Sequence, residues 1–321
     1  MGGYCKRGGI VLIVIGHVLQ PHTYIWNFIT LFHVPLFYII SGYLYRESQN
    51  NFGNLLKKKI KQFWIPYVSI SVAAYLIEAC FDARSFSAST AVKIILMLDA
   101  PKILGAEWFI AVLFYAEMLL CLMDEHMQEK ECNAVVFFGF IIGMFTQLPL
   151  GFSRVLTAGG YLYFGRKMKK LERVLAERPD SSLLLSFLML CVSAFWCYSS
   201  YSSNTYTSVI LSVICALCGS NVIISCSKIA EHKLSKKCCC KRFLEYLGQN
   251  TMGVVFFHFI AFRIVNIFIV AYKGISSLNI FEFPIIYDCG FIWKCIYVIA
   301  AFPISIVLYK PIEKMIALVK T

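Results

Sequence analysis

Long apolar stretches dominate this chain and constrain its fold more than any other feature. Ten of them approach the length of about 20 residues that a helix needs to cross the hydrocarbon core of a bilayer. They lie at 9–27, 28–45, 63–81, 107–123, 134–150, 151–165, 183–200, 207–226, 251–271 and 291–309. Apolar residues make up 59% of the 321 residues and charged residues only 15%, too apolar a balance for one soluble core. The sequence therefore predicts an all-α, polytopic bundle of about ten transmembrane helices.

The positive charges predict how these spans are oriented. Five segments would face the same side of the membrane, and together they carry 22 of the 30 Lys and Arg residues. These segments are the N-terminus, 46–62, 166–182, 228–242 and 310–321. Lys and Arg beside membrane helices remain in the cytoplasm. We therefore expect both termini to be cytoplasmic, an even number of spans, and a multi-pass protein of the cell (inner) membrane.

The loops between the spans are short, so a single membrane-embedded domain is predicted over 1–321. The net charge of +12 is accounted for by topology, and we expect the lipid bilayer, not nucleic acid, as a partner. The segment 91–98 is too short to span and is predicted to be interfacial or re-entrant. A cleaved signal peptide is the alternative for the first stretch, but no small-x-small cleavage site follows it.

Two histidines inside the first two spans are the leading functional candidates, because ionisable groups at membrane depth are costly. His17 lies eleven residues after Lys6, roughly 16 Å along a helix and near the middle of the membrane. His33 lies near the start of the next span, where Pro35 predicts a kink. Since the two spans are antiparallel neighbours, we expect both histidines to face one cavity, with Ser41 two turns further in.

Other polar groups in the spans admit two readings. His258 is predicted in the middle of a helix, and Glu117 lies in another span. Such groups either bind a ligand or pair with one another and stabilise the bundle. The densest cationic run, Lys57 to Lys61, either grips a phosphorylated cytoplasmic donor or sets topology and contacts anionic lipid. The pair Cys215 and Cys218 has metal-like spacing but sits in an apolar helix without a second pair, and we expect no metal site.

Three motifs follow one another along the chain. Residues 6–17 read Lys-Arg-Gly-Gly-Ile-Val-Leu-Ile-Val-Ile-Gly-His, and residues 32–44 read Phe-His-Val-Pro-Leu-Phe-Tyr-Ile-Ile-Ser-Gly-Tyr-Leu. A basic stretch ending in Ile-Pro-Tyr follows at 57–67, with weaker matches at 107–109, 163–167 and 247–258. On these motifs the chain resembles the acyltransferase-3 family of bacterial integral-membrane acyltransferases. It departs from the family at Gly3, where an Asp is usual, and at Lys6, where Arg is commoner.

The resemblance implies transfer of an acyl group, usually acetyl from acetyl-CoA, to a hydroxyl of a cell-envelope or exported polysaccharide or glycolipid. A sugar hydroxyl is a poor nucleophile at neutral pH, and histidine is the natural base to take its proton. We therefore expect His17 to be the base, His33 to orient the acceptor or share the proton, and Ser41 to bond to one of them. Direct transfer and passage through an acyl-histidine are both compatible with these residues.

The same resemblance suggests where the two substrates bind. The phosphates of CoA are expected on the cytoplasmic side, and the acceptor is expected among polar groups within the bundle. The expected donor-binding residues are Lys6, Lys57, Lys58, Lys61 and Trp108, and the expected acceptor-binding residues are Glu117, Asn250 and His258.

Two other functions are compatible with polar groups at the midplane. A transporter of a small solute or polysaccharide precursor would also place His, Glu and Arg there. Against it, the two halves of the sequence show no inverted repeat and no paired broken helices. A catalytically inert scaffold in a polysaccharide assembly complex is the third possibility. Labelled acetyl-CoA and candidate glycans would separate the three.

Overall fold

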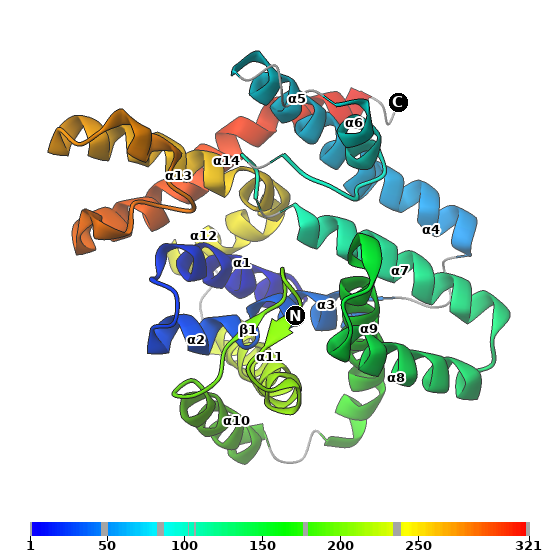
Figure 1. The fold of residues 1–321 in the computed structure, drawn as a ribbon. Coiled ribbons are helices and arrows are strands. Elements are labelled where there is room, and N and C mark those ends of the chain that lie inside the picture. The colour runs from blue at the N-terminus through cyan, green and yellow to red at the C-terminus, as the bar shows by residue number, and fades with distance from the viewer. Residues whose placement is uncertain are drawn as a thin grey trace. The chain divides into compact units, whose positions relative to one another are not determined.

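The computed structural model describes residues 2–45, 51–81, 87–101, 103–105, 107–175, 179–233 and 239–318 (Figure 1). The all-α prediction is confirmed: almost every described element is a helix. The first helices are α1 (Gly2–Val18), α2 (Tyr24–Thr30), α3 (His33–Tyr43), α4 (Phe52–Lys59), the π-helix η2 (Ile60–Trp64), α5 (Ile65–Phe81), α6 (Ala88–Ile95) and α7 (Trp108–His126). Then come α8 (Glu129–Phe145), the 3₁₀ turn η4 (Pro149–Gly151), α9 (Phe152–Leu175), α10 (Pro179–Ser193), α11 (Val209–Lys233), α12 (Cys239–Gln249), α13 (Thr251–Lys273), the 3₁₀ turns η5 (Ser277–Phe281) and η6 (Tyr287–Cys289), and α14 (Phe291–Leu318).

Five helical segments in the described part of the chain are long and apolar enough to cross a membrane. They are Tyr24–Tyr43, Phe52–Cys80, Val209–Ile229, Thr251–Lys273 and Phe291–Met315. The other expected spans correspond to α1, α7, α8, α9 and α10, which are shorter or carry more charge. A membrane protein is therefore supported, whereas the count of ten spans and the cytoplasmic termini remain predictions.

The boundary between the first two expected spans lies earlier than predicted. Helix α1 ends at Val18, and α2 begins at Tyr24, inside the stretch 9–27 that we expected to be continuous. The intervening turn contains Pro21, which has no N–H to continue a helix, and His22, whose φ is +63°. Hydropathy alone missed this turn because apolar residues resume at Tyr24.

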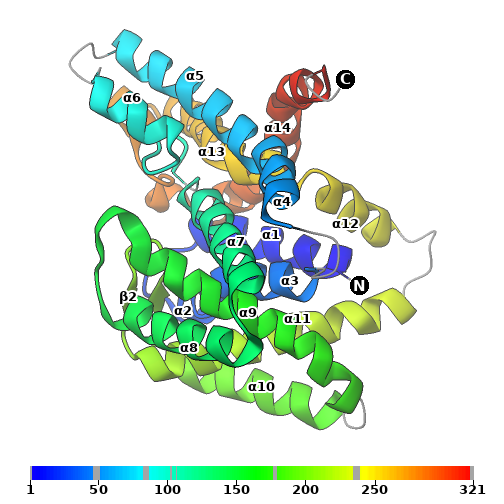
Figure 2. The same ribbon diagram turned by 90° about the vertical axis from the view of Figure 1, so that its right-hand side faces the viewer.

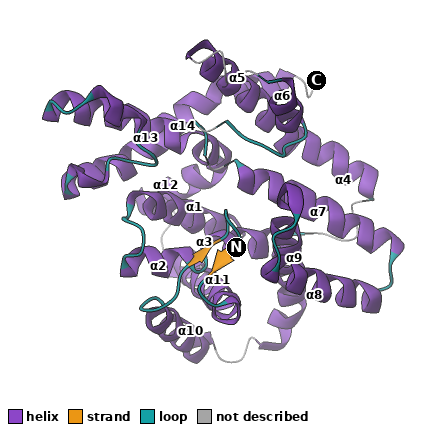
Figure 3. Ribbon diagram, in the orientation of Figure 1, coloured by secondary structure: helices purple, strands orange, loops and turns teal. Residues whose placement is uncertain are grey.

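A similar difference occurs in the expected span 183–200. Helix α10 ends at Ser193, and the chain then turns into two two-residue strands, β1 (Ser199–Ser200) and β2 (Thr205–Tyr206), which pair antiparallel (Figure 3). The apolar residues after Ser193 therefore form a turn and not a further helical turn. The segment 91–98 is indeed too short to span, because α6 is only eight residues long, and its interfacial or re-entrant position stays a prediction.

The described helices fall into two compact units. The first comprises Met1–Leu12, Pro21–Lys59 and Val112–Gly248, and the second comprises Ile13–Gln20, Ile60–Ala111 and Gln249–Thr321. Helices α1 and α7 thus contribute residues to both. The single domain predicted over 1–321 stays a prediction, and each unit is described separately below.

In the first unit, helix α9 is the central element. It packs along α3 and α8, and Figure 2 shows α8 and α9 lying side by side. The crossing with α3 is reciprocal: a Cβ on Gly42 would lie 1.8 Å from the carbonyl oxygen of Leu162, and one on Gly165 would lie 2.1 Å from that of Ile39. Backbone therefore meets backbone at this crossing, the small-residue packing common between membrane helices.

In the second unit, α13 and α14 form the main helix pair. Helix α5 contacts both α6 and α14. The segment of η5 and η6, which connects α13 to α14, folds back onto α13 and contains the cis peptide bond between Phe283 and Pro284. This unit contains the end of α1 and the whole of α13, which together carry the histidines described next.

Candidate active site

The second unit brings two histidines together from distant parts of the sequence. His17 lies in the last turn of α1, and His258 lies in the middle of α13. Their ring centroids are 5.4 Å apart, with 27° between the ring planes. His17 is partly exposed, whereas His258 is completely buried. The sequence identified both residues, but nothing in the pattern predicted that they would face each other.

The hydrogen bonds of His258 define its tautomer. Its Nδ1 lies 2.8 Å from the carbonyl oxygen of Val254 and 3.2 Å from that of Val255. A carbonyl oxygen only accepts, so Nδ1 carries the proton and donates it. Nε2 is then the acceptor nitrogen, and it has no hydrogen-bond partner among the described residues. An unsatisfied buried acceptor is costly, which marks this nitrogen as a functional candidate.

Aromatic side chains enclose the two histidines. The ring centroid of Phe259 lies 4.7 Å from that of His17 and 4.2 Å from that of His258, and Phe283 packs against Phe259 with a centroid distance of 4.7 Å and tilted ring planes. Gly105, with a φ of +64°, presses its backbone against this wall. A Cβ there would lie 2.9 Å from atoms of both Phe259 and Phe283. The buried His258 therefore lies in an apolar environment, whereas His17 beside it is partly exposed.

A buried polar network fixes this aromatic wall. The amide of Asn266 on α13 donates to the carbonyl oxygens of Ile280, at 3.1 Å, and Glu282, at 3.3 Å. The hydroxyl of Tyr297 on α14 donates to the side-chain oxygen of Asn266 and accepts from the amide of Ile286, at 3.2 Å. These bonds bracket Phe283 and hold its segment against α13. The network joins segments remote in sequence, and we did not predict it.

A buried carboxylate precedes α7 in the same unit. Glu107 is completely buried, and its Oε2 accepts a hydrogen bond of 2.7 Å from the hydroxyl of Ser71 on α5. Helix α5 also holds the loop that precedes α7. The Glu78 carboxylate on α5 accepts a hydrogen bond of 2.8 Å from the backbone amide of Ile103 in that loop. Trp108, predicted to bind the donor, follows directly and is partly exposed. Asn250, predicted to bind the acceptor, directly precedes α13 and makes no capping hydrogen bond with its side chain.

His33 and Ser41 lie on α3 in the first unit. His33 is the first residue of α3, and its Nδ1 lies 3.0 Å from the carbonyl oxygen of Ile29. The helix break falls at Leu31 and Phe32, so Pro35 occupies the first turn of α3, where it costs no helical hydrogen bond. Ser41 lies eight residues further along, about 12 Å by helical rise, so it does not bond to His33 directly.

The cationic run divides into exposed and paired residues. Lys57, Lys58 and Lys61 are exposed. Lys59 is largely buried, and its ammonium lies 2.5 Å from the carboxylate of Glu117 on α7, whose side chain is 6% exposed. Glu117, predicted to bind substrate, is therefore engaged by a lysine of the same unit. The side chain of Lys6 lies outside the described residues.

Comparison with known proteins supports one assignment. A family model described as an acyltransferase domain matches residues 6–310, nearly the whole chain, and includes both histidines and the network around them. No match is found among curated proteins, and none among solved structures. Among the described residues, no three His, Cys, Asp or Glu side chains gather as a metal site.

Proposed function

The chain belongs to the acyltransferase-3 family, whose chemistry is acyl transfer to a hydroxyl, and from this premise we propose that it is a membrane-bound O-acetyltransferase. The proposed donor is acetyl-CoA. The proposed acceptor is a hydroxyl of a cell-envelope or exported polysaccharide or glycolipid. The proposed location is the cell (inner) membrane, where a cytoplasmic donor can meet an envelope acceptor.

The pairing of His17 with His258 carries the proposal. His258 is held as the tautomer that presents a bare Nε2, and no acidic side chain is needed to fix it because backbone carbonyls do so. His17 lies in the last turn of α1. A positive charge at a helix C-terminus gains about 0.3–1 kcal/mol, so this position favours the imidazolium that forms when His17 takes a proton.

In the proposed reaction, the acceptor oxygen attacks the carbonyl carbon of the thioester while His17 removes the hydroxyl proton. The carbon–sulfur bond then breaks, and CoA leaves as a thiolate that recovers the proton from the imidazolium. His258 accepts a hydrogen bond at Nε2, from the acceptor hydroxyl or from His17, and so orients the reacting groups. No metal is required by this sequence of steps.

The aromatic wall has a protective role in this proposal. A thioester held near water hydrolyses, and an active site prevents this by excluding water. Phe259, Phe283 and the bare backbone of Gly105 fill the space around the histidines. In this proposal the aromatic wall favours transfer of the acetyl group to the sugar hydroxyl over its transfer to water.

The remaining candidates are assigned to the two substrates. Lys6, the exposed Lys57, Lys58 and Lys61, and Trp108 would hold CoA, since Lys binds phosphate as a point charge. His33 and Ser41 would contact the acceptor, together with Asn250. Glu117 forms an ion pair with Lys59, so the proposal is that a substrate would contact the pair and not Glu117 alone.

The test is acetyl transfer by membranes that contain equal amounts of wild-type or variant protein. Radiolabelled acetyl-CoA is supplied with candidate envelope glycans, and label in the glycan is counted. Substitution of His17→Ala should lower the rate by about 100-fold to 10,000-fold, the range for loss of a general base. Wild-type transfer by His17→Ala at normal protein content would refute the assignment. Solute uptake into proteoliposomes without glycan labelling would favour the transporter.

A further inference from the structure

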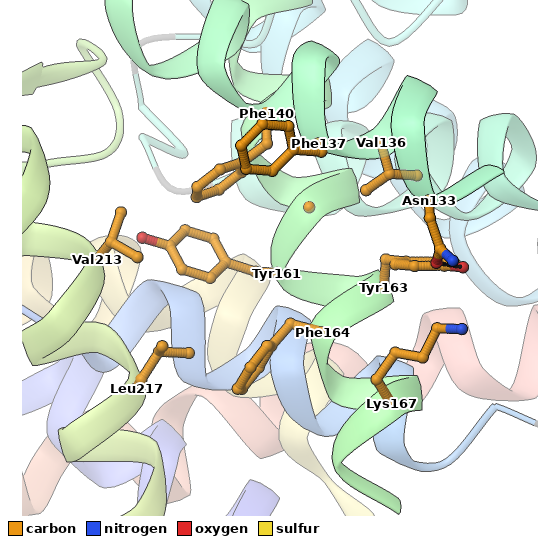
Figure 4. A pocket seen from close by; sticks show the side chains of 11 residues that line it. Asn133, Val136, Phe137, Phe140, Tyr161, Tyr163, Phe164, Lys167, Val213 and Leu217 are labelled. Atoms are coloured by element: carbon orange, nitrogen blue, oxygen red, sulfur yellow. Dashed lines mark hydrogen bonds between the residues drawn. The ribbon is translucent and has the colours of Figure 1, made fainter. Parts of the chain in front are cut away.

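An apolar groove runs across three helices of the first unit. Its volume is about 270 Å³. Phe137 and Phe140 come from α8, Tyr161 and Phe164 from α9, and Val213 and Leu217 from α11. Figure 4 shows these side chains around the groove, with the polar residues gathered at one end. The lining is that of a site for a hydrocarbon chain.

The groove has a closely packed floor. Gly160 of α9 faces α8, and a Cβ at this position would lie 2.1 Å from the ring of Phe140. One turn along, a Cβ on Gly143 would lie 2.8 Å from the backbone nitrogen of Thr157. The two helices are therefore in direct contact beneath the groove. The open volume of the groove lies above Gly160, between the larger side chains of its walls. It is a formed feature of the α8–α9 pair.

Opposite charges lie at one end of the groove. The ammonium of Lys167 pairs with the carboxylate of Glu129 and lies 5.0 Å from the centre of the Tyr163 ring. The Tyr163 hydroxyl donates to the side-chain oxygen of Asn133 at 2.6 Å. The side chains of Lys167 and Glu129 are 34% and 66% exposed. This polar end thus presents one cation and one anion to an incoming ligand.

The sequence places this end at the cytoplasmic surface. Lys167 lies in the basic segment 166–182, which is predicted to face the cytoplasm, and Glu129, the first residue of α8, pairs with it. From Asn133 to Phe140 the groove follows α8 for about 10 Å, within the depth of about 15 Å of one leaflet's hydrocarbon. The charges would therefore lie at headgroup depth and the aromatic walls among the acyl chains.

We propose that the groove binds one acyl chain of a zwitterionic inner-leaflet glycerophospholipid whose headgroup ends in a primary amine. The lipid phosphate accepts a hydrogen bond from Lys167, and the lipid ammonium donates one to Glu129. The two protein side chains, which pair with each other in the structure, then each pair with the lipid instead. A quaternary amine has no N–H to donate to the carboxylate. An anionic headgroup such as that of phosphatidylglycerol would satisfy Lys167 but would bring no cation to Glu129. Charge complementarity therefore selects the primary amine.

The experiment uses the full chain in detergent and native mass spectrometry. Phosphatidylethanolamine, phosphatidylcholine and phosphatidylglycerol with identical acyl chains are added in equal amounts, and retained lipid is measured. We expect phosphatidylethanolamine to exceed each of the others by about tenfold, as one charge-assisted hydrogen bond allows. Equal retention of the three would show a nonspecific lipid shell and overturn the proposal, as would preferential retention of a polyprenyl-linked lipid.

Variants test the two ends of the groove separately. Glu129→Gln should reduce phosphatidylethanolamine to the level of phosphatidylcholine, whereas Lys130→Gln, at the next residue and outside the groove, should change nothing. Val136→Trp, which fills the groove, should lower retention of all three lipids. The exchange Glu129→Lys with Lys167→Glu should restore the amine preference that each single change removes. An unchanged lipid order in Glu129→Gln, with an unchanged unfolding temperature, would overturn the proposal.

Discussion

The two units treat their buried ionisable groups differently. In the first unit, Lys59 pairs with Glu117, and Arg166 pairs with Asp124 at 2.6 Å, so charge meets opposite charge. In the second unit, His258 and Glu107 are completely buried, and their described partners are neutral: backbone carbonyls and the hydroxyl of Ser71. Buried atoms without a hydrogen-bond partner among the described residues occur in both units, for example Arg166 Nε in the first and His258 Nε2 in the second, so the contrast lies in the charge of the partners.

This difference distinguishes residues that stabilise the fold from residues available for a reaction. A buried charge with an opposite charge beside it is costly to disturb. A buried acceptor with only neutral partners keeps a lone pair for a proton. We therefore expect substitutions at the paired residues of the first unit to act mainly on stability, and substitution of His258 in the second unit to act mainly on acyl transfer. Four substitutions, from the largest expected effect to the smallest, test this contrast.

Removal of the His258 imidazole should have the largest effect. His258→Phe keeps a ring among the aromatic residues and removes the Nε2 acceptor, so acetyl transfer should fall by about 100-fold or more. The measurement is the initial rate at saturating acetyl-CoA, with protein content matched. His126→Phe is the matched control, because His126 makes the same bond to a carbonyl four residues earlier, at 2.9 Å, but is exposed. Equal loss in both variants would remove the distinction between the units.

Breaking the buried ion pair of the first unit should mainly affect stability. Lys59→Met leaves Glu117 charged and alone, which should lower the free energy of unfolding by about 3–5 kcal/mol. Lys59→Met combined with Glu117→Met should recover most of that loss. Thermal unfolding of the purified variants measures both, with Lys57→Met as the exposed control. A double variant as unstable as the single one would show that the two residues do not act as a pair.

Glu107 should show an intermediate effect on stability. Glu107→Ala removes the acceptor of the Ser71 hydroxyl and leaves that buried donor unsatisfied, which should lower the free energy of unfolding by about 1–3 kcal/mol. Glu107→Gln keeps an oxygen for Ser71 and should be milder. If the amide proved as damaging as alanine, the negative charge itself would be needed, and Glu107 would resemble the paired residues of the first unit.

Arg166 should show the smallest effect. The Arg166 side chain is only 4% exposed, but its partner Asp124 is 31% exposed, so solvent weakens the attraction between the two charges. Arg166 also lies over the ring of Tyr45, with its guanidinium carbon 3.8 Å from the ring centre. Arg166→Lys keeps the charge and loses the planar stacking, so the unfolding temperature should fall by only a few degrees. A larger fall would place this pair with Lys59 and Glu117.

The sequence predicted what depends on local pattern. Apolar stretches predicted most of the helices, and the lone histidines in apolar surroundings identified His17 and His258. The early turn at Pro21 was missed because hydropathy averages over windows and apolar residues continue on both sides. The proline itself was the signal that would have identified it, since it cannot continue a helical hydrogen-bond ladder.

The partners of the candidate residues were not predictable in the same way. His17 and His258 are 241 positions apart, and periodicity shows which face of a helix is polar without showing which helix lies opposite. The same applies to Lys59 with Glu117 and to Tyr297 with Asn266. A single sequence contains no record of these pairs, because each depends on how helices pack after they have formed.

The reciprocal glycine contact between α3 and α9 has a mechanical consequence. Gly42 and Gly165 each meet the opposite backbone, so a slide by one residue would drive a Cβ into a carbonyl oxygen on both sides at once. The two helices therefore have one register and are expected to move together as a rigid pair. A force applied to the C-terminal end of α9 would therefore be passed on to α3, which begins at His33.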